Sequence, residues 1–174
     1  MVGYPGAGKT TISKYIHELT GAVHLWVDGE RQQRFSQPTY SQAENTSLYD
    51  DLNALTVELL STGKSVIFDT NFNFYKDREY LRSLASQNSA ECVIIWVTTP
   101  LGVAEQRAVK GKSHTNDTRP FGKIAEKDFK RIVGNFEVPR ADEVVHKITG
   151  IDLSIDHIRK FLIRCGVNLN QTKN

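Results

Sequence analysis

The feature that most constrains this chain is its residues 3–10, which read Gly-Tyr-Pro-Gly-Ala-Gly-Lys-Thr. Glycines let a loop turn its backbone N–H groups inward, where they form a nest for phosphate oxygens. A helical pattern follows at once, with Ile12, Ile16 and Leu19 on one face. The N-terminus of that helix would direct a positive dipole end at the same anion. The spacing G-x-x-x-x-G-K-T therefore predicts a phosphate-binding loop that opens a helix.

The polar residues of this loop predict a nucleotide with a metal ion. Lys9 supplies a mobile positive charge for the β- and γ-phosphates, and the Thr10 hydroxyl suits magnesium as a ligand. We therefore expect ATP and Mg²⁺ as cofactors. The residues predicted to bind them are Gly3, Tyr4, Pro5, Gly6, Ala7, Gly8, Lys9, Thr10 and Thr11.

Apolar runs alternate with helical patterns along the rest of the chain. Runs typical of strands lie at residues 24–27, 65–68, 92–97 and 144–148. Strands that alternate with helices imply crossover connections and a mostly parallel sheet that is covered on both faces. The length of 174 residues suits one domain. We predict a single P-loop kinase domain over residues 1–174, with the three-layer α/β/α P-loop NTPase fold and a mostly parallel central sheet.

The start of the chain conflicts with this expectation. A phosphate-binding loop normally follows a central strand of the sheet, yet only Met1 and Val2 precede Gly3. Two alternatives stay open: the first strand is unusually short, or residues that belong upstream are missing. If the strand is absent, we expect a gap at the centre of the sheet and a loss of stability.

Two aspartates follow predicted strands. Asp69 ends the run at residues 66–68, and a carboxylate at the C-terminal edge of a parallel strand faces the ligand crevice, where it can bind magnesium. The alternative role for Asp69 is to cap a turn. Asp28 precedes Arg31 by three residues, so a helix would place a base and a cation near one face. The alternative is an exposed ion pair of little consequence.

The segment from about residue 107 to residue 122 is polar and lacks core-forming side chains. A solvated surface loop is one interpretation. Beside a phosphate site, we expect instead a lid whose cations stabilise the charge of a phosphoryl-transfer transition state and whose closure excludes water. Its basic residues include Lys110 and Lys112. We rank Arg107 and Arg119 first, because arginine offers two parallel N–H donors.

Several of these stretches resemble one family in a consistent order along the chain. Residues 3–11, 28–31 (Asp-Gly-Glu-Arg) and 68–72 (Phe-Asp-Thr-Asn-Phe) resemble the polynucleotide-kinase-like group, an AAA-type family of small P-loop kinases. Residues 136–139 with 142–143 are similar to the tail motif of that group. The chain is thus similar to the kinase domain of polynucleotide 5′-hydroxyl kinase.

This resemblance implies roles for individual residues. Asp28 would be the general base that takes the proton of the acceptor hydroxyl, and Arg31 would contact the acceptor. Asp69 and Asn71 would lie on the acceptor and metal side of the site. The predicted catalytic residues are therefore Lys9, Asp28, Arg107 and Arg119, the substrate-binding residues are Arg31, Asp69 and Asn71, and the metal ligands are Thr10 and Asp69.

We accordingly predict an ATP-dependent phosphotransferase that moves the γ-phosphate to a hydroxyl group of a small molecule or of a nucleic-acid 5′ end. The alternative is a nucleotide-binding regulatory or ATPase module without a dedicated acceptor. A formal net charge of +2 does not point to nucleic acid. Two cysteines fit a reducing compartment, and no apolar stretch suits a membrane span, so we expect a cytoplasmic protein.

Overall fold

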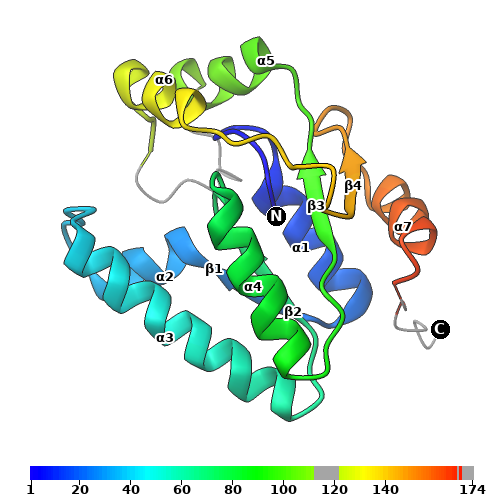
Figure 1. Cartoon of the computed structure of the whole chain (residues 1–174). Helices are drawn as coiled ribbons and strands as arrows, with labels where there is room; N and C mark the ends of the chain where they lie inside the picture. Colours follow the sequence, from blue (N-terminus) through cyan, green and yellow to red (C-terminus); the bar gives the residue numbers. More distant parts are fainter. Residues whose placement is uncertain (112–121, 168, 170–174) are drawn as a thin grey trace.

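In the computed structural model, the described residues are 1–111, 122–167 and 169, and they form alternating helices and strands (Figure 1). The strands in this part of the chain are β1 Val23–Trp26, β2 Val66–Asp69, β3 Ile94–Val97 and β4 Val145–Ile148. The helices are α1 Lys9–Thr20, α2 Val27–Arg34, α3 Gln42–Ser61, α4 Tyr75–Gln87, α5 Leu101–Glu105, the π-helical turn η1 Gln106–Lys110, α6 Glu126–Gly134 and α7 Ile155–Arg164. The predicted α/β class is confirmed.

The strands pair in parallel, as predicted, but they form two separate pairs. Strand β1 pairs with β2, with Val23 opposite Val66, and β3 pairs with β4, with Ile94 opposite Val145. Between the pairs, Val2 makes a single parallel bridge to Trp96 of β3. The two residues before the loop therefore lie at the centre of the sheet, where the first strand was expected.

Side chains of the strands alternate between two apolar layers, because successive residues of a strand point to opposite faces. Ile67, Ile95 and Val97 pack in a cluster that includes α1 and α7. Phe68 and Ile94 pack instead in clusters that include α3 and α4. Burial on both faces explains why the strands read as short apolar runs and not as alternating patterns.

Local signals define the helix ends. The Ser41 side chain accepts a hydrogen bond from the Glu44 amide, so α3 begins before the predicted leucine pattern, and Gly63 follows its end with a φ of 74°. Ser154 caps α7 in the same way. Across residues 1–111, 122–167 and 169, no helix has both the length and the apolar character that crossing a membrane requires.

One predicted boundary is wrong, with a consequence for the site. The strand predicted at residues 24–27 ends at Trp26, and Val27 instead begins α2. Asp28 therefore lies in the first turn of a helix, where the helix dipole favours a negative charge.

A buried ion pair connects α4 to the segment before β4. Arg78 and Glu143 have side chains that are 1% and 0% exposed, and they share two hydrogen bonds of 2.6 and 2.8 Å. The same guanidinium donates to the carbonyl groups of Phe72 and Glu137. Arg78 thus holds the loop after β2 and the segment of residues 137–143 together.

We predict that Arg78→Met lowers the free energy of unfolding by about 3–5 kcal/mol, because it leaves the Glu143 carboxylate buried without its cation. Urea denaturation measures this loss. The matched control is Arg82→Met, since Arg82 forms an exposed pair with Glu79 in the same helix and the expected loss is within about 0.5 kcal/mol. Equal losses for the two variants would contradict the assigned role.

Candidate active site

The phosphate-binding loop runs from the central bridge at Val2 into α1. Gly6 adopts a φ of 79°, a conformation that favours glycine, and a Cβ atom at this position would overlap the carbonyl oxygen of Ala104 in α5. The loop is therefore packed directly on the helical segment that leads to the predicted lid. Its backbone has the glycine-dependent shape that a phosphate nest requires.

Lys9 is buried and is bound to the loop itself. Its Nζ donates hydrogen bonds to the carbonyl oxygens of Gly3 at 2.9 Å and Tyr4 at 3.0 Å. Burial lowers the pKa of the Lys9 ammonium to about 8, while the charges of Asp69 and Asp28 act in the opposite direction. A phosphate group that replaced these carbonyl contacts would raise that pKa again.

Asp28 and Asp69 lie close enough to Lys9 for their charges to act on its ammonium group. The pKa of Asp28 is raised by desolvation and by the charge of Asp69, and the cations of Lys9 and Arg31 oppose that rise. Asp28 is nevertheless exposed, so a second molecule can reach its carboxyl group although neighbouring protein atoms partly desolvate it. A raised pKa makes the carboxylate a stronger base.

Asp69 has a partner that the sequence did not reveal. The carboxylate is 2% exposed, and its Oδ2 lies 3.0 Å from Nε2 of His24 in the adjacent strand. The β1–β2 register puts His24 opposite Ile67, and Asp69 therefore points to the same face two residues further along. His24 and Asp69 lie 45 residues apart in the chain, and the register of the two strands makes them neighbours.

Arg31 is buried and held on several sides. Its guanidinium pairs with Glu44 of α3, donates to Asn45 Oδ1 at 2.8 Å, and lies 4.8 Å from the centre of the Tyr40 ring. Its Nε is buried and has no hydrogen-bond partner among the described residues. Arg31 thus combines a charge that Glu44 balances with one buried donor that has no partner among the described residues.

The loop after β2 carries the other predicted substrate residue. Asn71 is exposed, and its carbonyl oxygen accepts the amide of Asn73 at 2.8 Å. The neighbouring Thr70 is fixed by a 2.7 Å hydrogen bond between its Oγ1 and the Tyr49 hydroxyl. The side-chain oxygen of buried Asn73 has no partner in the described part of the chain, and no sequence pattern pointed to this residue.

Two further residues brace the phosphate-binding loop, and the sequence analysis missed both. Thr99 Oγ1 donates to the carbonyl oxygen of Ala7 at 2.7 Å, and the Gly150 amide donates to the same Oγ1 at 3.0 Å. Thr99 follows β3 and Gly150 follows β4, so the rule that led to Asp69 also applies to them. A Cβ atom on Gly150 would overlap the Ala7 carbonyl oxygen.

Of the predicted lid, the structure describes residues 107–111 and 122. Arg107 lies in η1, and its Nη1 donates to the carbonyl oxygen of Gly150 at 2.9 Å, so it sits beside the loop brace. Lys112 and Arg119 lie outside the described residues.

The residues present suit a nucleotide with magnesium. Thr10 is half-buried in the first turn of α1 and offers a hydroxyl, and Asp69 offers a carboxylate, which are ligand types that magnesium prefers. Among the described residues, no group of three His, Cys, Asp or Glu side chains could hold a metal ion. A magnesium ion here would therefore take most of its ligands from phosphate and water, as it commonly does in phosphotransfer sites.

The sequence pattern of the AAA domain family matches residues 1–139, which is well over half of the chain. This chain belongs to that family. The predicted nucleotide-binding P-loop family is thereby confirmed. The narrower resemblance to polynucleotide kinases stays a prediction.

Several known proteins with a similar sequence or fold are kinases. A shikimate kinase from Persephonella marina is 25% identical over 134 residues, which is 76% of this chain and 76% of that protein. A putative kinase from Chloroflexus aurantiacus matches with a TM-score of 0.68 at 18% identity, over 94% of this chain and 95% of that one. A sugar kinase from Janibacter sp. matches with a TM-score of 0.66 at 15% identity, over 95% and 92%. The structural matches confirm the P-loop kinase fold.

We predict that Gly150→Ala disrupts the loop brace. The added methyl group must displace the Ala7 carbonyl oxygen, so we expect a loss of about 1–3 kcal/mol in the free energy of unfolding and weaker nucleotide binding. Urea denaturation and titration with a fluorescent ATP analogue measure the two effects. Gly134→Ala in α6 is the control, because its added methyl group meets no atom within 4 Å. A Gly150→Ala variant that behaves like the control would refute the brace.

Proposed function

We propose that this protein is an ATP-dependent kinase that transfers the γ-phosphate to a hydroxyl group, with Asp28 as the general base. The observation that carries the proposal is the placement of an accessible carboxylate of raised pKa beside the lysine of a phosphate-binding loop. A module that only senses a nucleotide has no need of a base at this position. A kinase needs one group that takes the hydroxyl proton as the new P–O bond forms.

The other predicted residues take complementary roles in this proposal. Lys9 would exchange its two carbonyl acceptors for phosphate oxygens. Thr10 and Asp69 would hold magnesium, which supplies charge neutralisation at the phosphates when it is bound. Arg107 and Arg119 would meet the γ-phosphate from the lid. Arg107 already lies beside Gly150, within the part of the site that braces the loop.

For the acceptor, we favour a small hydroxyl compound over a polynucleotide. Glu44 balances the charge of Arg31, so Arg31 does not offer the uncompensated cation that would bind a nucleic-acid phosphate. The exposed Asn71 offers hydrogen bonds to a polar acceptor. The relatives named for shikimate and sugar support this class, since both are small polyhydroxy compounds.

The test is transfer of labelled γ-phosphate from ATP to sugars, other polyols, shikimate and 5′-hydroxyl oligonucleotides. We expect label on a small hydroxyl compound. Asp28→Asn should reduce that transfer by about 10²- to 10⁴-fold with little change in ATP affinity, because it removes only the proton acceptor. Asp51→Asn is the control, since Asp51 is an exposed carboxylate that pairs with Arg34.

Each of three other outcomes would change a different part of the proposal. Label on the oligonucleotide alone would replace our acceptor class with a nucleic-acid 5′ end. ATP binding without any labelled acceptor would favour the regulatory or ATPase module. Full transfer by the Asp28→Asn variant would remove Asp28 from the role of base.

Lys9 gives nucleotide affinity a specific pH dependence. In the free protein its pKa is about 8, whereas phosphate oxygens keep it protonated in the complex, so binding takes up a proton at higher pH. We expect the association constant for MgATP to be flat below pH 8 and to fall by up to about tenfold per pH unit above it. Isothermal titration calorimetry from roughly pH 6.5 to roughly pH 9.5 measures how the association constant changes with pH. In Lys9→Arg the side chain stays charged, and the decline should disappear.

A further inference from the structure

An exposed aromatic side chain lies beside the proposed base. Tyr40 belongs to the segment between α2 and α3, and it is 53% exposed. The centre of its ring lies 4.8 Å from the guanidinium carbon of Arg31. Arg31 follows Asp28 by three residues in α2, so the two side chains are neighbours on one face of the helix. The ring of Tyr40 is therefore near the carboxyl group that would take the proton.

The electrostatics of two tyrosines agree with this position. Burial raises the pKa of the Tyr40 hydroxyl, and the negative charge of Asp28 raises it further. Burial also raises the pKa of the Tyr49 hydroxyl, on which the charges of Arg31 and Asp28 act in opposite directions. The two hydroxyl groups thus lie within range of the same carboxylate.

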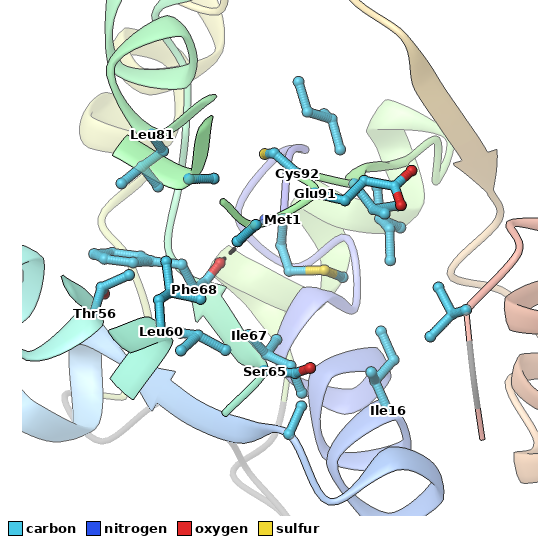
Figure 2. Close-up of a pocket in the computed structure, with 18 of the residues that line it drawn as sticks. Met1, Ile16, Thr56, Leu60, Ser65, Ile67, Phe68, Leu81, Glu91 and Cys92 are labelled. Atoms are coloured by element: carbon cyan, nitrogen blue, oxygen red, sulfur yellow. Dashed lines mark hydrogen bonds between the residues drawn. The ribbon is translucent and has the colours of Figure 1, made fainter. Parts of the chain in front are cut away.

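Tyr49 is the less exposed of the two tyrosines and is held from two sides. Its hydroxyl lies 2.7 Å from Thr70 Oγ1, next to Asp69. Its ring is parallel to the ring of Phe68 within 5°, with 6.4 Å between the ring centres. Phe68 in turn borders the cavity shown in Figure 2. Tyr49 is therefore fixed in the wall of the site, whereas Tyr40 presents more of its surface to solvent.

Tyr40 has a backbone conformation that few residues adopt. Its φ is 54°, in the left-handed region, which a bulky side chain disfavours. Strain of this kind persists only where the surrounding contacts impose it, and it is most frequent at functional sites. Glycine or asparagine would adopt the same conformation with less strain. Local backbone stability therefore gives no reason for a tyrosine at this position.

Two residues in the first turn of α3 impose this conformation. One carboxylate oxygen of Glu44 accepts the Tyr40 amide at 3.2 Å, and the other pairs with Arg31. Asn45 donates to the carbonyl oxygen of Tyr40 at 3.1 Å and accepts a hydrogen bond from Arg31 at 2.8 Å. Both residues thus bind Arg31 and the backbone of Tyr40 at once. Their hydrogen bonds hold the ring of Tyr40 against the guanidinium group.

An exposed aromatic ring on a rigid support suits the face of another ring. The face of an aromatic ring carries partial negative charge, which attracts C–H groups. Tyrosine has few side-chain torsions, so packing against it costs little conformational entropy. A cyclic compound can present a row of C–H groups without further ordering, whereas an open chain must first lose internal rotations.

We propose that the ring of Tyr40 is the platform on which the acceptor packs, and that the acceptor is a cyclic hydroxyl compound. Its C–H face would lie on this ring while one of its hydroxyl groups reaches Asp28. This inference rests on the proposed kinase function and narrows its acceptor class. Tyr40 is then a residue that determines specificity, and Glu44 and Asn45 hold it in place.

The first test measures binding without phosphate transfer. The protein is labelled with fluorotyrosine and held with Mg²⁺ and a non-hydrolysable ATP analogue, and myo-inositol, shikimate, glucose and open-chain sorbitol are added in turn. Tyr40→Phe assigns the fluorine signal of Tyr40 by its loss. We expect a cyclic compound to shift this signal and sorbitol to bind about 10-fold more weakly. The signal of Tyr80, which is 55% exposed in α4, should not move.

The second test uses the compound that receives label in the transfer assay. We expect Tyr40→Asn to raise the KM for this acceptor by about 10-fold or more with little change in kcat, because a platform binds the ground state and the transition state alike. Asparagine tolerates a positive φ, so Tm should change by less than about 2 °C. Tyr40→Phe retains the ring and should keep the KM within about threefold. Tyr80→Asn is the matched control.

Four outcomes would overturn the proposal. Absence of a shift at Tyr40 with every cyclic compound would remove the platform, and so would an unchanged acceptor KM in Tyr40→Asn. Binding of sorbitol as tight as that of the cyclic compounds would remove the cyclic class. A large loss of Tm and of ATP affinity in Tyr40→Asn would make Tyr40 a structural residue. A shift at Tyr40 without any labelled product would support the platform and count against the kinase function alone.

Discussion

The candidate site depends on the join between the phosphate-binding loop and the carboxyl ends of parallel strands. Val2 fixes the start of the loop by its two hydrogen bonds to β3, and Thr99 fixes the middle by its bond to Ala7. Gly150 lies so close to the carbonyl oxygen of Ala7 that no larger residue fits at this position. Because strand ends are rigid in a packed sheet, these few contacts set the position of the loop for phosphate.

Charge balance is the second constraint on the site. The charges of Asp69 and Asp28 act on the pKa of Lys9, and those of Lys9, Asp69 and Arg31 act on the pKa of Asp28. Glu44 balances Arg31 from a neighbouring helix. An isolated charge in such a crowded region would be costly, so each group depends on its partners. In the proposed reaction, phosphate would add its charge beside Lys9, magnesium would add its charge beside Asp69, and the acceptor hydroxyl would bind beside Asp28.

Two buried arginines hold the surrounding elements in place by the same principle. Arg78 connects α4 to the segment that ends at Glu143, and Arg31 connects α2 to α3 through Glu44. Two residues near the C-terminal end of this segment have structural partners: Glu143 neutralises Arg78, and Asp142 accepts a hydrogen bond from the Tyr75 hydroxyl at 2.8 Å. These residues support the loop after β2 that carries Asn71.

The sequence by itself determined the phosphate-binding loop, the α/β alternation and the place of Asp69 at the end of a strand, because these features depend on contiguous residues and on local periodicity. It also showed the conflict at Met1 and Val2. Only the tertiary structure decided the partners His24, Glu44, Thr99 and Gly150 and the division of the sheet into two pairs. Those contacts join residues far apart in the chain, so they depend on strand register and helix packing, which no local pattern encodes.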